Sequence, residues 1–298
     1  GVDVSIRNTQ FFNNYAGTNV SNYFGSGAGL YAVGGNAISM LNSTFQNNSV
    51  EGTINAVAAA YLGGFTSILI SNSWFENNQA FSFAFGNFVE YVGAAVSIDS
   101  SASQRGNLFM VNSYFGENTT AGLKLFNVDG TIASSTFFEN RYIGRPGQLM
   151  GAGLSMRDSS IDIFNSTILG NSSPSSGVDE FGVGGIDAEN SMLTLEHVTI
   201  AKNETVGPPR VGGLQLDGST ATLRGTLLAE NFGTVNGNIG VFGGSILSVH
   251  SSQFGDDASE INGTNTANVF ADTAMLDPVQ DMGCSVLAGA GPSARCVR

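Results

Sequence analysis

The chain repeats one pattern of apolar and polar positions nine times, and each copy closes on an Asn or Asp. A large apolar residue stands three positions before the closing residue, and a second stands eight before it. In eight of the nine copies a third apolar residue stands ten positions before the closing residue. The apolar positions ten and eight before it are two apart, which is the spacing of one face of a β-strand. The closing residues are Asn14, Asn48, Asn78, Asn118, Asn140, Asn171, Asn203, Asn231 and Asp257.

Two further features complete the repeat. A small hydroxyl residue usually stands five positions before the closing residue, and an Asn often precedes that hydroxyl. Most copies are also preceded by a Gly/Ala pair and alternating apolar residues, as in Gly153-Leu154 and Gly213-Leu214. Each repeat therefore predicts about three short strands and three corners. The Ala-rich stretch at residues 52–62, which is the nearest candidate for a helix, is also expected to be a strand.

A strand with one apolar face is unstable alone, so the repeats are expected to stack with parallel strands in register. The sequence thus predicts an all-β fold, a right-handed parallel β-helix (solenoid) of about nine coils over residues 1–257. Residues 258–298 are expected to form a C-terminal cap and tail. Equivalent columns should then lie about 4.8 Å apart, with Phe45, Phe75 and Phe115 stacked inside. The closing Asn side chains should form a hydrogen-bonded ladder. The backbone of the closing Asn should adopt the left-handed conformation at the corner.

Composition and charge exclude several classes of function. The net charge is −13, with only 11 Lys and Arg residues, so nucleic-acid binding is not expected. The sequence contains no run of 18 apolar residues, so no membrane span is predicted. The sequence indicates no metal site and no cofactor.

The two cysteines, Cys284 and Cys296, lie in a tail rich in Gly, Pro and Ser. Two cysteines are too few for the usual four-ligand zinc site, so a disulfide that closes a small terminal loop is the favoured interpretation. The alternative is two free thiols in a reducing compartment.

Eight Asn-x-Ser/Thr sequons are candidate glycosylation sites. They indicate a secreted glycoprotein, but Asn-Ser-Thr is also the corner chemistry of the repeat itself, so both interpretations stay open. The candidates are Asn19, Asn42, Asn47, Asn118, Asn165, Asn171, Asn203 and Asn262.

The first coil begins at Gly1 within a predicted strand and without a cap. Its strand edge and apolar interior are therefore expected to be covered, either by preceding chain or by another subunit.

The motif Gly-Gly-Leu-x-Leu, a turn, and Leu-x-Leu-x-x-Ser-Thr-Phe/Ile-x-x-Asn resembles the pectin-lyase-like parallel β-helix superfamily. The clearest copies are residues 151–171 and 212–231, and the likeness extends over residues 1 to about 257. Within that superfamily the chain is most similar to secreted and cell-surface repeat proteins, including polymorphic autotransporter adhesins. The resemblance implies a fold more than a function, because lyases, hydrolases and inert adhesins share it.

The catalytic motifs of pectin hydrolases in that superfamily are mostly missing. Asp256-Asp257 matches one of them, whereas no Gly-His-Gly and no Arg-x-Lys occurs. Lys124 is expected to point outward from a strand, and Lys202 to lie at a corner. His197 and His250 are interpreted as structural. The outward residues of the middle coils nevertheless offer acids and an arginine on neighbouring strands, namely Asp187, Glu189, Glu196, Asp217 and Arg224.

Together these features predict a non-catalytic structural or adhesive module of an extracellular or cell-surface protein, one that could form filaments. The alternative is a polysaccharide-active enzyme, a lyase or a glycoside hydrolase, or a carbohydrate-binding module. Carbohydrate is accordingly a candidate ligand.

Overall fold

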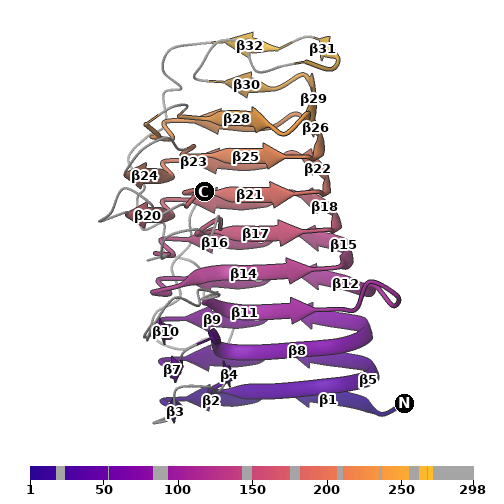
Figure 1. The fold of residues 1–298 in the computed structure, drawn as a ribbon, viewed down its shortest axis with the longest axis vertical. Helices are drawn as coiled ribbons and strands as arrows, with labels where there is room; N and C mark the ends of the chain where they lie inside the picture. Colours follow the sequence, from indigo (N-terminus) through magenta and orange to yellow (C-terminus); the bar gives the residue numbers. More distant parts are fainter. Residues whose placement is uncertain are drawn as a thin grey trace.

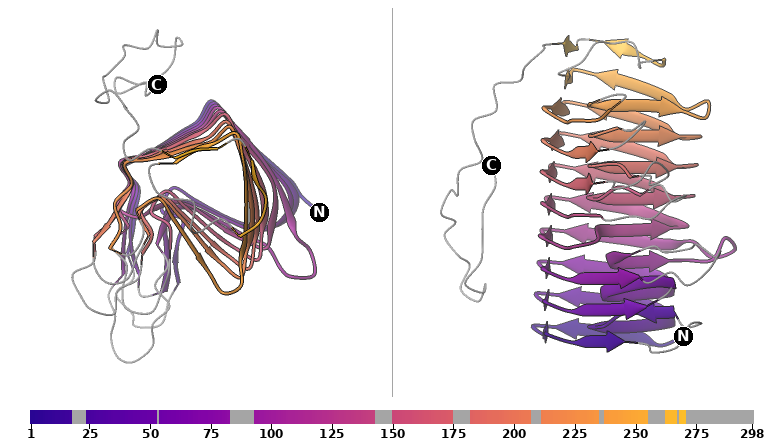
Figure 2. Two further views of the ribbon diagram at one scale, coloured as in Figure 1. Left: turned by 90° about the horizontal axis from the view of Figure 1, so that it is seen from above. Right: turned by 60° about the vertical axis from the view of Figure 1, so that its left-hand side comes forward.

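The computed structural model describes residues 1–17, 24–52, 54–82, 93–142, 150–174, 182–206, 211–234, 237–254, 262–266 and 268–270. These residues form strands, turns and bends and contain no helix, and the strands pair in parallel with the equivalent strands of the coils above and below. Figure 1 shows the coils stacked along one axis, and in the axial view of Figure 2 they superimpose on one another. The predicted all-β parallel β-helix is therefore confirmed.

Three faces enclose the interior. The first face contains β1(Asp3–Arg7), β5(Leu30–Leu41), β8(Ile54–Ser71), β12(Gly106–Val111), β15(Val128–Ala133), β18(Ser160–Phe164), β22(Met192–Glu196), β26(Thr220–Arg224), β29(Ile246–His250) and β31(Asn265–Thr266). The second contains β4(Phe24–Ser26), β11(Ala94–Asp99), β14(Ala121–Phe126), β17(Leu154–Arg157), β21(Ile186–Glu189), β25(Leu214–Asp217) and β28(Ile239–Phe242). Both belong to one 17-stranded sheet, because the long strands β5 and β8 continue around the corner between them.

The third face is a ten-stranded sheet of short strands, one to a coil. It contains β2(Gln10–Phe12), β6(Thr44–Gln46), β9(Trp74–Glu76), β13(Tyr114–Gly116), β16(Thr136–Phe138), β19(Thr167–Leu169), β23(Thr199–Ala201), β27(Leu227–Ala229), β30(Gln253–Phe254) and β32(Val269–Phe270). Short corner strands pair beside it, namely β3(Tyr15–Gly17), β7(Ser49–Gly52) and β10(Gln79–Ser82) in one sheet and β20(Ser172–Pro174) and β24(Glu204–Val206) in another.

The number of coils differs slightly from the nine expected. The last strands, β31 and β32, lie beyond residue 257 and still pair with β29 and β30. Pairing therefore continues past the predicted boundary between helix and cap. Residues 271–298 are outside the described part of the chain.

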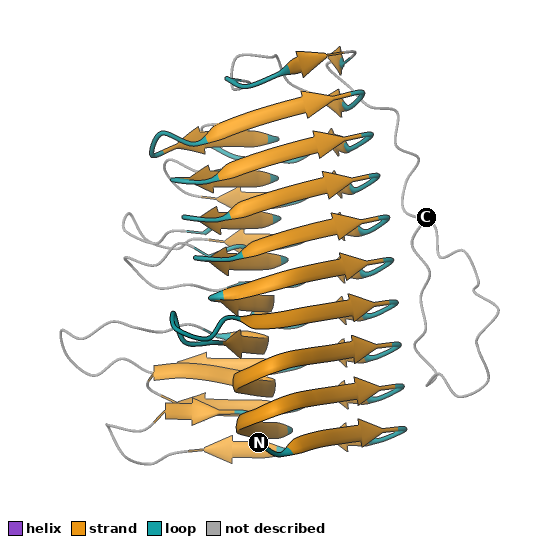
Figure 3. Cartoon of the chain, turned by 90° about the vertical axis from the view of Figure 1, so that its right-hand side faces the viewer, coloured by secondary structure: helices purple, strands orange, loops and turns teal. Residues whose placement is uncertain are grey.

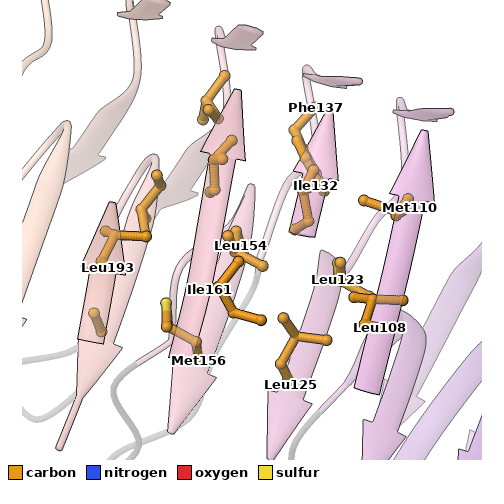
Figure 4. Packing of buried hydrophobic residues seen from close by; sticks show 14 of the residues in the cluster. Leu108, Met110, Leu123, Leu125, Ile132, Phe137, Leu154, Met156, Ile161 and Leu193 are labelled. Carbon is orange, nitrogen blue, oxygen red and sulfur yellow. The ribbon is translucent and has the colours of Figure 1, made fainter. Parts of the chain in front are cut away.

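The core consists of apolar columns that run along the axis (Figure 4). On the third face the rings of Phe11, Phe45, Phe75, Phe115 and Phe137 stack with centroids 4.4–5.0 Å apart. On the first face Ile163, Leu195 and Leu223 are fully buried in register. The predicted stacking of the Phe column is confirmed.

A ladder of Asn side chains holds each coil to the next. The Nδ2 of Asn78 donates to the Oδ1 of Asn118 (3.0 Å), and the same Oδ1 accepts the backbone N–H of Asn78 (2.9 Å). The other Nδ2 hydrogen bond of Asn78 goes to the carbonyl of Phe45 in the preceding coil (2.9 Å). The pattern repeats from Asn14 onward and reaches Asn238, which accepts from Asn231 at 2.7 Å. The predicted final member, Asp257, lies outside the described residues.

The expectation that the closing Asn adopts the left-handed conformation is wrong. The residue before it does so instead, as at Asn47 (φ 55°) and Asn77 (φ 54°). A second left-handed corner lies at the column six positions before the closing residue, for example at Asn42 (φ 49°). The closing Asn does not take the left-handed conformation because its amide must face the interior. There it forms the ladder and satisfies buried backbone groups.

Cys284 and Cys296 are outside the described residues, so their disulfide stays a prediction. A bond between them closes a small loop and should stabilise the tail by about 3 kcal/mol in the chain-entropy model. Reduction should therefore loosen the tail and leave the coils folded. The mass of the alkylated chain, compared with and without prior reduction, checks this. Two alkylated thiols in the unreduced native protein would contradict the prediction.

Candidate functional site

The strongest concentration of candidate chemistry lies on the outer side of the second face. Strand alternation directs Leu154, Ile186 and Leu214 into the core and the residues after them outward. Two outward columns result. One contains Tyr61, Ser97, Lys124, Ser155, Asp187 and Gln215, and the other contains Asp99, Phe126, Arg157, Glu189, Asp217 and Phe242.

Asp187 is the most perturbed group on this face. Although its side chain points away from the core, it is only 2% exposed. Burial, followed by the nearby charges of Glu189 and Asp217, raises the pKa of Asp187 to about 7, while Arg157 acts in the opposite direction. The Nε2 of Gln215 lies 3.4 Å from one carboxylate oxygen of Asp187. A buried carboxyl of this kind holds its proton in the weakly acidic range, as general acids must.

Arg157 and Glu189 form a bidentate ion pair next to Asp187. The Nε of Arg157 donates to one Glu189 oxygen at 2.8 Å, and its NH2 group donates to the other at 2.6 Å. The two side chains are 55% and 30% exposed, respectively, so the pair faces solvent. Such fork-to-fork geometry fixes both side chains in place.

Aromatic side chains occupy the N-terminal end of the same face. The rings of Tyr31 and Tyr61 stack with centroids 5.2 Å apart, and the Tyr31 side chain is well exposed. Burial and the neighbouring Asp99, which accepts its hydrogen bond, raise the pKa of the Tyr61 hydroxyl. Exposed aromatic rings with a hydrogen-bonding group are enriched at binding interfaces.

The acids predicted as a group are divided between two faces. Asp187, Glu189 and Asp217 lie together on the second face, whereas Glu196 and Arg224 are register partners on the first. The sequence pattern could not separate them, because outward positions alternate identically on every strand. The sequence analysis did not identify Arg157, Ser155 and Gln215. The only signal for them was register, since Arg157 aligns with Glu189, and Ser155 and Gln215 align with Asp187.

The remaining candidates lie apart from this group. Lys124 is on the second face, two strands from Asp187, as its outward position predicted. Lys202 is a left-handed corner residue whose Nζ lies 3.6 Å from Glu230. His197 is also at a left-handed corner, and the Nδ1 of His250 contacts the Thr266 hydroxyl at 2.8 Å. Asp256 and Asp257 are outside the described residues.

The sequons differ sharply in accessibility. Asn118, Asn171 and Asn203 are fully buried, and both Nδ2 hydrogen bonds of each belong to the ladder, which argues against a glycan there in the folded protein. Asn42, Asn47, Asn165 and Asn262 are exposed. Asn19 lies outside the described residues. The corner-chemistry interpretation therefore explains the three buried sequons.

Neither a metal site nor a membrane helix is found in the part of the chain that the structure describes. No group of three His, Cys, Asp or Glu side chains there could hold a metal ion. The same residues include no helix long and apolar enough to cross a membrane.

The comparisons with known proteins give no assignment. No protein-family model matches the chain, and no curated protein and no solved structure matches it. The site must therefore be interpreted from its own geometry.

The titration of Asp187 predicts a pH-dependent stability. An unfolded Asp loses its proton near pH 3.9, whereas Asp187 in the folded chain keeps its proton up to about pH 7. The folded state thus binds more protons across this window, and the free energy of unfolding should fall by up to ~4 kcal/mol as the pH rises from 4 to 7. Urea unfolding at several pH values measures the effect.

Asp187→Asn should remove that part of the pH dependence and stabilise the protein at pH 8. Asp162→Asn is the matched control, because Asp162 is an exposed acid on the first face and its replacement changes the net charge equally. Equal pH profiles for wild type and Asp187→Asn would contradict the assignment.

Proposed function

We propose that this chain is a non-catalytic structural or adhesive β-helix module of an extracellular or cell-surface protein. The observation that carries the proposal is the Asn ladder, which connects successive coils from Asn14 to Asn238 through buried side-chain hydrogen bonds. Each buried bond resists separation of the coils, because breaking it leaves unsatisfied polar groups. A rod reinforced in this way suits a spacer that presents its faces and corner loops to a partner.

The state of the acids on the second face supports a non-catalytic role. Glu189 is held by Arg157 in a bidentate pair, and Asp187 is buried beside Gln215. A hydrolase needs two carboxyls positioned on either side of an accessible glycosidic bond. Here Asp187 is buried away from solvent, and the charge of Glu189 is neutralised by Arg157. The resemblance to the pectin-lyase-like superfamily, and within it to surface repeat proteins and autotransporter adhesins, agrees with such a role.

A polysaccharide-active enzyme is the second candidate, and one observation favours it. The raised pKa of Asp187 gives a carboxyl that holds its proton. Two further acids lie beside it, Glu189 on the same strand and Asp217 on the neighbouring strand. In that role Asp187 would be the general acid, and the aromatic side chains at the end of the face would bind sugar rings.

One experiment distinguishes the two candidates. The protein is incubated with a panel of neutral and acidic polysaccharides, and new reducing ends, unsaturated products and retention by each polysaccharide are measured. An adhesive module should bind at least one polymer without cleaving it. Cleavage by the wild type that Asp187→Asn abolishes would establish the enzyme instead. Asp162→Asn again serves as the control.

The extracellular assignment rests on the exposed sequons Asn42, Asn47, Asn165 and Asn262 and on the predicted Cys284–Cys296 bond. Enzymatic deglycosylation of protein from its native source should lower the mass at one or more of these sites. A mass unchanged by this treatment, together with free thiols, would contradict the assignment.

The N-terminal end of the rod is the proposed contact for further chain or another subunit. Strands β1, β2 and β3 each pair with one following strand, and Val4, Ile6 and Phe11 pack there only partly buried. A coil stacked on this end would complete the sheets and the Phe column. Intact-chain mass together with native mass, both from source material, tests whether this end is covered.

A further inference from the structure

The outer side of the first face carries a cluster of apolar side chains at its centre. The strands of this face lie side by side in the view of Figure 3. Register places Leu41, Ser71, Val111, Ala133 and Phe164 in one outward column. Leu69 and Phe109 are neighbours in the next column, and Phe109 is 51% exposed. We call Leu41, Leu69, Phe109, Val111, Ala133 and Phe164 the apolar patch.

The patch differs from the rest of this face. The column of Leu69 and Phe109 becomes polar at Thr131 on β15 and Asp162 on β18. The column of Leu41 and Phe164 becomes polar at Glu196 and Arg224. Phe109 is the exposed residue of the patch, and the other five are partly buried around it. A contiguous apolar surface of this kind indicates a contact surface. Within the described residues the patch lies over the strands from β5 to β18.

Two opposite charges lie symmetrically about the patch. Arg7 on β1 is three strands before Val111 on β12, and Glu196 on β22 is three strands after it, in the same column. At about 4.8 Å a strand, each charge is roughly 14 Å from the centre. A twofold rotation about an axis parallel to β12 therefore brings Arg7 of one copy opposite Glu196 of a second copy, and Glu196 opposite Arg7.

We propose that this face binds a second copy of the chain, with the apolar patches of the two copies packed face to face about that twofold axis. The rotation places each outward column of one copy over the same column of the partner, with the coils in the opposite order. Arg7 of one copy then faces Glu196 of its partner, Leu41 faces Phe164, and the Phe109 rings of the two copies meet near the axis. Because the contact is isologous, it closes as a dimer and does not propagate into a filament.

The charge pairing selects the second copy over other occupants. An unrelated apolar ligand would require the patch alone, whereas Arg7 and Glu196 also match a partner with the same spacing. Within one chain Arg224 is the register partner of Glu196, and Arg7 donates to the Ser5 hydroxyl. Charges at the rim of an apolar contact fix register and orientation more than they add affinity. The orientation is thus set by two equivalent ion pairs, one at each end of the contact.

Native mass measured over a range of concentrations tests the dimer. The wild type should approach twice the 30.9 kDa of one chain, and Phe109→Asp should stay at the mass of one chain. Phe242→Asp is the matched control, because Phe242 is also exposed (42%) but lies on the second face. Ile6→Asp, at the N-terminal end, should also leave the dimer intact and so separates this contact from end-to-end stacking. Circular dichroism confirms that each variant is folded.

Charge reversal provides the decisive arm. Arg7→Glu and Glu196→Arg should each raise the dimer dissociation constant at least tenfold, and the double variant should restore it to near the wild-type value. A wild type that remains monomeric at every concentration overturns the proposal, as does a dimer that all these variants leave unchanged. A dimer weakened by both single reversals but not rescued by the double variant overturns the twofold arrangement.

The exposed sequons Asn42 and Asn165 directly follow Leu41 and Phe164 at the edge of the patch. The measurement is therefore made on protein without glycans. If protein from its native source is monomeric until it is deglycosylated, the proposed face is supported. Monomers both before and after deglycosylation overturn it.

Discussion

Asn118→Ala should destabilise the β-helix by about 3–6 kcal/mol, because one side chain satisfies several buried groups at once. The Oδ1 of Asn118 accepts both the backbone N–H and the Nδ2 of Asn78, and its own Nδ2 donates to the carbonyl of Phe75 and to Asn140. Removing the amide breaks all four of these hydrogen bonds, and a hydrogen bond contributes about 0.5–1.5 kcal/mol net. The cavity left by the missing amide adds to the loss.

Urea unfolding followed by the fluorescence of Trp74 measures this effect. Trp74 is the only tryptophan and lies on the strand that pairs with the strand of Tyr114, so it reports on the coil next to Asn118. Asn112→Gly is the matched control, since Asn112 is exposed at a left-handed corner of the same coil (φ 50°). Glycine adopts that conformation without strain, so the control should change stability by less than about 1 kcal/mol.

A second variant separates hydrogen bonding from packing. Asn118→Asp keeps the shape of the side chain but replaces the donating amide by an oxygen that faces the carbonyl of Phe75 and the Oδ1 of Asn140. Repulsion between acceptors should make this variant less stable than the wild type as well. If both Asn118 variants unfold like the wild type, the ladder contributes no stability, and the observation behind the proposed function is lost.

The regular part of this fold follows from the sequence because each column repeats. A single Phe three residues before an Asn predicts little, but the equivalent positions of Phe45, Phe75 and Phe115 can only be satisfied together if the coils stack in register. The same logic predicted the ladder, since stacked Asn side chains pair along the axis. The repeat thus predicted the strands, the core and the ladder.

What the repeat did not predict are features that depend on how coils and corners meet in space. Asn238, seven residues after Asn231, accepts the Asn231 Nδ2 in the ladder although it is not a closing residue of the repeat. The left-handed conformation falls one residue before the closing Asn. Asp187 and Glu196 look equivalent in the sequence, yet they lie on different faces and only Asp187 is buried. Burial of an outward side chain arises from its surroundings, which its own strand pattern does not encode.

Phe75→Ala should cost about 3–5 kcal/mol, because the ring lies at the centre of the aromatic column. It is fully buried and stacks on Phe45 at 5.0 Å and on Phe115 at 4.6 Å. Its removal forfeits the buried area of the ring, opens a cavity and breaks two stacked contacts. The stacking cannot be recovered by collapse, since the spacing of the neighbouring rings is fixed by the strands that carry them.

Two comparisons make that prediction specific. Phe75→Leu should lose clearly less, because the same column already accommodates Ile168, Ile200 and Leu228 in later coils. Phe242→Ala, at an exposed position on the second face and outside the proposed dimer contact, should change stability by less than about 1 kcal/mol. Urea unfolding under identical conditions measures all three variants. Equal losses from Phe75→Ala and Phe242→Ala would contradict the register of the core, because a buried and a half-exposed ring cannot contribute alike.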